Sequence, residues 1–263
     1  MPDRRVEIVG HGGAGAYYPG NSRPSFERAI QIGVDRVECD LQRSRDGQIV
    51  LVHDEMVPTA DGARVKVAAL TAAELAGLVP DLVILDDLIE MVKGQASLML
   101  DVKQSGYEEE VIAAIHRHNL SIDSSISTTY ASTLWRLRRA FPHMRMGLSV
   151  GDWSRSVPSA AGHRVARPVL RSVFPIGLPR VLGLLGASET MLHHGVITRR
   201  LVDAVHASGQ RVNAWTVDDE EEMQRMAACG VDGIISNRPD VARRITQAPR
   251  SSGLPEALTG RPG

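Results

Sequence analysis

The stretch VECDLQRSRDGQIVLVH (residues 37–53) decides the fold, because it places two strand-like runs so close together that no helix fits between them. The runs Val37–Leu41 and Ile49–His53 flank an Asp-Gly dipeptide at 46–47. Asp-Gly between alternating runs is a strong signal for a β-hairpin. We therefore expect Ile49–His53 to fold back, antiparallel, on the end of Val37–Leu41.

Outside this stretch, short strand-like runs alternate with longer helical patterns. Strands that alternate with helices imply parallel pairing through βαβ units. With the hairpin strand set aside, eight parallel strands are left, which predicts an α/β fold: a (β/α)8 TIM barrel with a small hairpin at the C-terminal mouth after strand 2. The other strand candidates are Val6–Gly10, Ser97–Val102, Ser124–Ser127, Met146–Val150, Thr190–His193, Val212–Val217 and Gly233–Ser236. The helix candidates include Ser25–Ile32, Glu108–His118, Ala131–Ala140, Thr198–Ser208 and Asp219–Cys229.

The length of the chain fits one such barrel. It has 263 residues, and α/β barrels of about 250 residues fold as one unit. We expect a single barrel domain over residues 1–246. The remainder, 247–263, is rich in Pro, Gly and Ser, and we expect it to be a flexible tail.

Composition and charge exclude several classes of protein. The 43% of hydrophobic residues exclude a disordered chain, and 30 basic against 31 acidic residues argue against a nucleic-acid partner. Cys39 and Cys229 are too few for a disulfide scaffold or a zinc site. The N-terminus has no long apolar signal region, and no run approaches the ~18 apolar residues of a membrane span. We therefore expect a cytoplasmic protein.

The segment 153–188 has an unusual composition. It contains five arginines and many apolar residues, but no Asp or Glu. It follows the fifth predicted barrel strand, so it should emerge on the face where barrels place their active sites. One interpretation is an ordinary pair of connecting helices. The other is a lid over the mouth or a weak contact with a membrane surface, since basic amphipathic segments favour anionic membranes.

Acidic side chains gather where two predicted strands end. Glu38 and Asp40 point to the same face of their strand, because side chains alternate along a strand. Asp101 and Lys103 repeat this spacing in the sequence LMLDVK. Three carboxylates without Cys or His at metal-ligand spacing suit a hard divalent cation such as Mg²⁺ or Ca²⁺.

Two histidines should lie beside this cluster. If residues 46 and 47 are the only two turn residues of the hairpin, His53 lies opposite Asp40 across the ladder. His11 follows the first strand, which neighbours the second strand in a barrel. Two histidines beside a metal held by carboxylates suit general acid–base chemistry on a phosphodiester, with Lys103 adding positive charge for the phosphoryl oxygens.

The sequence resembles a known family, the glycerophosphodiester phosphodiesterases. The resemblance begins with GHGGAGAYYPGNSRPSFERAIQIGVDRVECDLQRSRDGQIVLVHDE (10–55) and continues, in order, with ALTAAEL (69–75), LDVK (100–103), AWTV (214–217) and GVDGIISNRP (230–239). It implies a (β/α)8 barrel that hydrolyses glycerophosphodiesters to glycerol phosphate and an alcohol. The residue roles that it implies are an acid–base pair of His11 and His53, ligands of a divalent ion at Glu38, Asp40 and Asp101, and substrate contacts by Lys103 and Trp215.

Three positions depart from the pattern of that family. Gly12 replaces an Arg, Gly20 replaces a Glu, and Asp101 replaces a Glu. An Asp at the position of the third carboxylate ligand resembles the pattern of the sphingomyelinase D-like barrels. Activity on lysolipids, of the sphingomyelinase D or lysophospholipase D type, is therefore an alternative function. The two glycines keep open a catalytically impaired barrel that only binds a phosphate ligand. In every case the expected partner is a small-molecule or lipid phosphodiester, and the sequence leaves the oligomeric state open.

Overall fold

Eight parallel strands close into a barrel in the computed structural model. The structure describes residues 5–120, 123–150 and 160–247; of residues 160–165 it describes the backbone alone. Around the barrel the strands are ordered β1-β11-β10-β9-β8-β7-β6-β2, and β2 pairs with β1 to close it. The predicted (β/α)8 barrel is therefore confirmed. Its strands are β1 (Glu7–Gly10), β2 (Arg36–Arg43), β6 (Ser97–Val102), β7 (Ser125–Thr128), β8 (Arg145–Ser149), β9 (Glu189–His193), β10 (Arg211–Trp215) and β11 (Gly233–Ser236).

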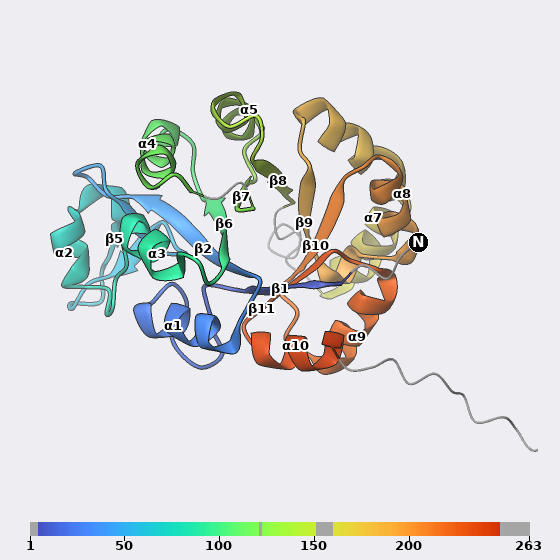
Figure 1. The fold of residues 1–263 in the computed structure, drawn as a ribbon, viewed down its shortest axis with the longest axis horizontal. Coiled ribbons are helices and arrows are strands. Elements are labelled where there is room, and N and C mark those ends of the chain that lie inside the picture. The colour runs from blue at the N-terminus through green and yellow to red at the C-terminus, as the bar shows by residue number, and fades with distance from the viewer. Residues whose placement is uncertain (1–4, 121–122, 151–159, 248–263) are drawn as a thin grey trace, which may run out of the picture.

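Helices surround the strands (Figure 1). They are α1 (Arg23–Ile32), α2 (Ala72–Ala76), α3 (Leu85–Val92), α4 (Glu108–His118), α5 (Ala131–Ala140), α7 (Ala160–Leu185), α8 (Arg199–Ala207), α9 (Glu220–Cys229) and α10 (Pro239–Gln247), with short 3₁₀ turns η1 (Val67–Ala69) and η2 (His194–Val196). Local signals set their ends: in α1 the Ser22 side chain accepts the Ser25 N–H as N-cap, and Gly33 ends the helix at φ 78°. Phe26 and Ala29 of α1 are fully buried.

The hairpin after β2 forms as predicted, but its register differs by one residue. β3 (Ile49–Leu51) pairs antiparallel with β2. The loop has three residues, 45–47, and Gly47 adopts φ 83°, the left-handed conformation that such a loop requires. Asp40 therefore lies opposite Val52, whose N–H donates to the Asp40 carbonyl at 3.1 Å. The expected pairing of Asp40 with His53 is wrong, because it assumed a two-residue turn.

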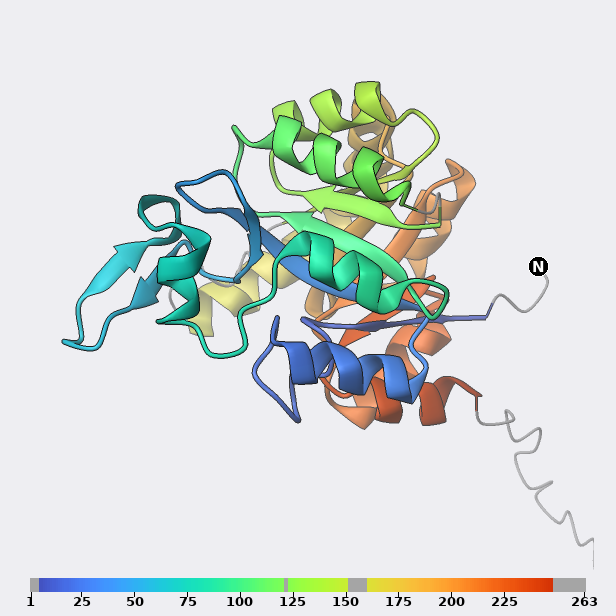
Figure 2. The ribbon, with the colours of Figure 1, turned by 60° about the vertical axis from the view of Figure 1, so that its left-hand side comes forward.

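A second hairpin follows, which the sequence did not predict. β4 (Met56–Pro58) and β5 (Arg64–Lys66) form a separate two-stranded ribbon. Figure 2 shows this ribbon and α2, in cyan, extending from the barrel on the side away from the N-terminus. Val57 packs there with Val50, Val67 and Leu75 in a small apolar cluster of their own. The mouth of the barrel thus has a rim on the side of His53.

The base of the barrel is filled by polar side chains. The Arg36 side chain is 1% exposed, and its guanidinium donates to Ser125 Oγ at 2.8 Å, to Glu189 Oε1 at 3.1 Å and to Asn213 Oδ1 at 3.0 Å. Burial would raise the pKa of Glu189, but the charge of Arg36 keeps that pKa below its ordinary value. Four apolar side chains close the barrel interior between this network and the mouth: Val9, Met99, Met191 and Ile235.

The segment 153–188 lies partly outside the described residues. Its described part consists mainly of α7, a helix that contains Pro168, Pro175 and Pro179. Leu178 and Leu182 are buried, and α7 packs on α8, so this part forms barrel wall. The expected tail overlaps α10 at Gln247 and otherwise lies outside the described residues.

Candidate active site

Glu38, Asp40 and Asp101 converge at the C-terminal ends of β2 and β6. Glu38 and Asp40 share a face of β2, and the register of the sheet sets Asp40 beside Asp101. One carboxylate oxygen from each lies within 4.8 Å of the others. Burial and the charge of Asp40 raise the pKa of Glu38 well above its ordinary value. The three carboxylates therefore lie together, as expected from the sequence.

Lys103 supplies the nearest cation. Its Nζ lies 2.6 Å from Asp40 Oδ1 and 2.6 Å from Asp101 Oδ2. Burial alone would lower the pKa of Lys103, but the charges of Asp101 and Asp40 raise it. For Asp40 the effects are reversed: burial would raise its pKa, but the Lys103 ammonium lowers it. Lys103 is therefore a fixed positive charge at the centre of the cluster.

The donor set of this cluster fits a divalent cation. Three ionised carboxylates against one ammonium would leave two negative charges without a partner. Asp40 Oδ1 is buried and receives no hydrogen bond of good geometry, only the ionic contact with Lys103. Carboxylate oxygens are the ligands preferred by hard cations such as Mg²⁺ and Ca²⁺.

Neighbouring loops hold the carboxylates in place. Asn21, at φ 63°, donates through Nδ2 to Asp40 Oδ2 at 2.6 Å, and its Oδ1 accepts the Asp40 N–H at 3.0 Å. The Gly12 N–H donates to Glu38 Oε2 at 2.8 Å. Gly12 adopts φ 51°, and a Cβ there would lie 3.0 Å from Asn21 N. Glycine at 12 therefore allows this loop to approach the Asn21 backbone closely.

His11 is held by a chain of hydrogen bonds. Asn237 Nδ2 donates to Asp218 Oδ2 at 2.7 Å, which turns Asn237 Oδ1 toward His11 Nδ1 at 2.9 Å. An amide oxygen only accepts, so His11 Nδ1 carries the hydrogen and Nε2 is the nitrogen left free. Asp218 also accepts the Asn237 N–H at 2.8 Å. The orientation of the Asn237 amide is thus fixed.

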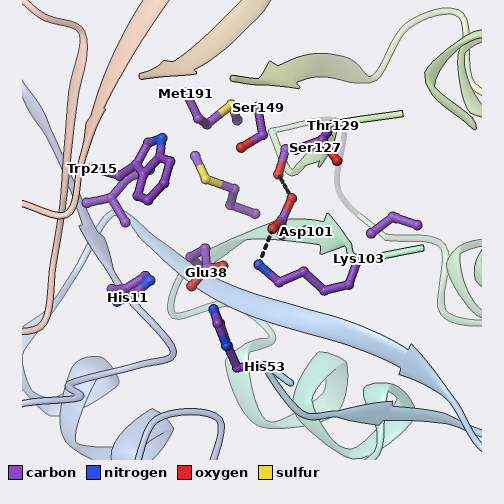
Figure 3. Close-up of a pocket in the computed structure, with 13 residues that line it drawn as sticks. His11, Glu38, His53, Asp101, Lys103, Ser127, Thr129, Ser149, Met191 and Trp215 are labelled. Atoms are coloured by element: carbon purple, nitrogen blue, oxygen red, sulfur yellow. Dashed lines mark hydrogen bonds and ion pairs between the residues drawn. The ribbon is translucent and has the colours of Figure 1, made fainter. Parts of the chain in front are cut away.

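His53 lies in the loop after β3, and Figure 3 shows it beside Glu38, as it also shows His11. Its side chain is 47% exposed, and Nδ1 lies 2.8 Å from Asp54 Oδ1. Because a carboxylate only accepts, Nδ1 donates here too, and Nε2 is again the free nitrogen. The two histidines therefore line the same pocket as the carboxylates, although not through the strand pairing that the sequence suggested.

A pocket of about 270 Å³ joins these groups. Trp215 forms part of its apolar wall, and its Nε1 is buried without a hydrogen-bond partner. The lining residues are His11, Glu38, His53, Met99, Asp101, Val102, Lys103, Ser127, Thr129, Ser149, Met191, Trp215 and Ile235.

All seven site residues predicted from the sequence lie in or against this pocket. Asp40 lies behind the lining residues, in contact with Lys103. The sequence did not predict a role for Asn21, Asn237 or Asp218. The signal for the first two was present, because Asn21 and Asn237 stand within the quoted motifs GNS and SNRP.

Comparison with known proteins gives one consistent result. Residues 11–241 match the model of the glycerophosphoryl diester phosphodiesterase family. A glycerophosphodiester phosphodiesterase from Bacillus altitudinis is 24% identical over 92% of this chain and 98% of its own, and one from Caldanaerobacter subterraneus is 26% identical over 89% and 94%.

Solved structures show the same fold. An Oleispira antarctica phosphodiesterase in complex with the product sn-glycerol-3-phosphate has a TM-score of 0.76 at 22% identity, with 92% of this chain and 96% of that chain covered. A glycerophosphodiester phosphodiesterase from Thermotoga maritima has a TM-score of 0.70 at 19% identity, with 90% and 96% covered.

Proposed function

Because the chain belongs to the glycerophosphoryl diester phosphodiesterase family, we propose that this enzyme hydrolyses glycerophosphodiesters to glycerol phosphate and an alcohol, with a divalent metal ion and two histidines. The observation that carries the proposal is the convergence of His11, His53 and the three-carboxylate cluster in one pocket. The neighbour that holds sn-glycerol-3-phosphate supports this product.

Glu38, Asp40 and Asp101 would hold the ion, Mg²⁺ or Ca²⁺. When bound, such an ion neutralises charge on the phosphate and lowers the pKa of an attacking hydroxyl. Lys103 binds a phosphoryl oxygen through its ammonium, and its contact with two of the carboxylates keeps it at that position. Trp215 would contact the bound diester through its indole ring, which forms part of the pocket wall.

The hydrogen-bond partners of the histidines suggest how the proton transfers are divided. His11 has a neutral amide partner and a free Nε2, which suits the acceptance of a proton from the attacking oxygen. Asn237 keeps the hydrogen on Nδ1 throughout. His53 has the carboxylate of Asp54 as its partner at Nδ1, which orients the ring and leaves Nε2 free at the pocket, so we assign to His53 the proton that is donated to the leaving alcohol.

A second candidate function is the hydrolysis of lysolipids, of the sphingomyelinase D or lysophospholipase D type. The apolar wall of the pocket favours it, because Met99, Val102, Met191 and Ile235 line the same cavity as the charged groups. Such a wall can contact the glyceryl ester or the first carbons of an acyl chain. The shorter Asp101, in place of Glu, leaves additional room on this side.

The cell compartment is also part of the proposal. Both cysteines are free thiols, Cys39 buried and Cys229 half-buried. Free thiols fit a reducing compartment, so we propose a cytoplasmic location.

Phosphorus NMR of the purified chain tests the activity directly. Glycerophosphocholine and lysophosphatidylcholine are incubated in turn with Mg²⁺, with Ca²⁺ or with chelator. The proposal predicts a glycerol phosphate signal from glycerophosphocholine that disappears with chelator and in Glu38→Gln. Faster turnover of lysophosphatidylcholine would favour the second candidate. Binding without any product, with either ion, would overturn both and leave a barrel that only binds phosphate ligands.

A further inference from the structure

The solvent-facing side of α7 is apolar over four turns. We name it the α7 outer face, and define it as Val169, Val173, Ile176, Arg180 and Leu184. These residues are spaced by three or four positions, so they lie on one side of the helix. The exposed fractions are 54% for Val169 and Val173, 59% for Ile176 and 87% for Leu184. The opposite side is buried in the barrel wall through Leu178 and Leu182.

This arrangement is unusual for a helix of a barrel wall. A surface helix normally presents polar residues to solvent, as the adjacent α8 does with Arg199, Arg200 and Asp203. A window of 18 residues within Ala166–Leu185 of α7 instead has a mean hydropathy of 1.3, although only 17% of that window is buried. Scattered exposed apolar side chains need no explanation, but four of them aligned on one face of a helix mark an interaction surface.

Charge indicates the kind of partner. The five arginines of 153–188 give this segment a formal charge of +5, so the rest of the chain, at −6, makes up the net charge of −1. Arg180 lies within the α7 outer face, and Arg167 is exposed two residues before its start. Two copies of such a surface would bring like charges together. An anionic lipid surface offers both apolar contact and opposite charge.

The position of α7 relates this surface to the pocket. The Arg171 Nε–H donates to the carbonyl of Gly195, in the η2 turn directly after β9, at 3.1 Å. Arg171 is therefore level with the C-terminal mouth of the barrel, and the helix begins more than two turns beyond it. Figure 2 shows the start of α7, in yellow, at the same end of the barrel as the β4–β5 ribbon.

We propose that the α7 outer face docks on the surface of anionic membranes, which brings the mouth of the barrel beside the lipid headgroups. Val173, Ile176 and Leu184 enter the boundary between headgroups and acyl chains. Arg180 extends its guanidinium toward lipid phosphates, as long basic side chains do at this interface. Docking by this surface does not depend on the proposed hydrolysis.

Vesicle co-sedimentation of the full chain tests the proposal. Vesicles of phosphatidylcholine alone are compared with vesicles that also contain phosphatidylglycerol. We expect binding to the anionic vesicles that weakens as salt is raised. The double variant Ile176→Asp/Leu184→Asp should lower the partition coefficient by about tenfold or more, because two apolar contacts are replaced by charges of the wrong sign. Arg180→Glu should lower it as well.

Matched controls separate this surface from general effects. Trp135→Asp places a charge at a 54% exposed apolar position on α5, and Arg199→Glu reverses an exposed charge on α8. Both should bind vesicles as the unmodified chain does. All variants should keep the unmodified activity on water-soluble glycerophosphocholine, whatever that activity is, because the substituted residues lie outside the pocket.

Three results would overturn the proposal. The first is no sedimentation of the unmodified chain with anionic vesicles, and the second is equal binding of the Ile176/Leu184 variant. The third is an oligomer, found by analytical ultracentrifugation, that this variant dissociates in the absence of lipid. The last result would assign the α7 outer face to a second copy of the chain.

Discussion

Replacing Asn237 by Ala tests how the chain positions His11. Asn237 Oδ1 accepts the Nδ1–H of His11 at 2.9 Å, and Asp218 fixes the Asn237 amide through a 2.7 Å bond. When His11 accepts a proton, it becomes positively charged and this hydrogen bond becomes charge-assisted. A hydrogen bond to a charged group contributes about 1.5–3 kcal/mol, which corresponds to about a 10- to 150-fold decrease in kcat when it is lost.

The isosteric variant Asp218→Asn tests the same chain without a change of volume. The new amide can place an NH₂ group opposite Asn237 Nδ2, so the Asn237 amide turns over and presents its own NH₂ to His11. The hydrogen of His11 then moves to Nε2, and this nitrogen can no longer accept a proton. We expect a decrease in kcat at least as large as that of Asn237→Ala.

Steady-state kinetics with glycerophosphocholine, together with ¹⁵N NMR of the histidine tautomers, measures both effects. The decrease should appear in kcat with little change in KM, and the NMR signals should report hydrogen on Nδ1 of His11 in the unmodified chain. Asp240→Asn is the control, because Asp240 accepts from the surface Tyr17 hydroxyl and takes no part in the hydrogen bonds that link Asp218, Asn237 and His11. Unmodified kcat in Asn237→Ala, or hydrogen on Nε2 in the unmodified chain, would refute this reasoning.

Three further predictions concern the metal cluster and stability. Chelation should lower the Tm reversibly, because loss of a divalent ion leaves three carboxylates within 4.8 Å with the Lys103 ammonium between them; an unchanged Tm would show that Lys103 and a proton on Glu38 balance them. Arg36→Ala should reduce the free energy of unfolding in urea by about 3–5 kcal/mol, because Glu189 is then buried without its cation, and a decrease below about 1 kcal/mol would contradict this. The hydrogen bond from Arg225 lowers the pKa of Glu222 to about 2. Since Glu222 is partly exposed, its ionised form should stabilise the fold by about 1 kcal/mol relative to Glu222→Gln above pH 4.5. This difference should fade as the pH falls toward 2, and a constant difference across that range would refute it.

Much of the barrel was predictable because its signals are local. Alternation along a strand predicted that Glu38 and Asp40 share a face, and the Asp-Gly dipeptide identified the strand that does not belong to the barrel. The register of that hairpin was not predictable with the same certainty. Whether Gly47 ends a two-residue or a three-residue loop depends on how the loop packs, and the sequence of the turn allows both.

The remaining features depend on contacts between distant parts of the chain. Asn237 reaches His11 across 226 positions, so no spacing argument connects them, although both stand in recognisable motifs. The β4–β5 ribbon is short and contains Pro58, and such runs give weak strand signals. The outer face of α7 was visible only as an unusual composition until the structure showed which of its side chains are exposed.

The central claim is that His11 and His53 transfer protons beside a cation held by the carboxylate cluster. The most direct test is kcat for glycerophosphocholine at saturating Mg²⁺ or Ca²⁺ in His11→Ala and His53→Ala, with metal binding followed by calorimetry. His116→Ala, at an exposed position on α4, is the control. The account predicts a decrease in kcat of about 10²- to 10⁴-fold for each of the first two variants, with metal affinity retained and the control unchanged. Unmodified kcat in either His11→Ala or His53→Ala would contradict it.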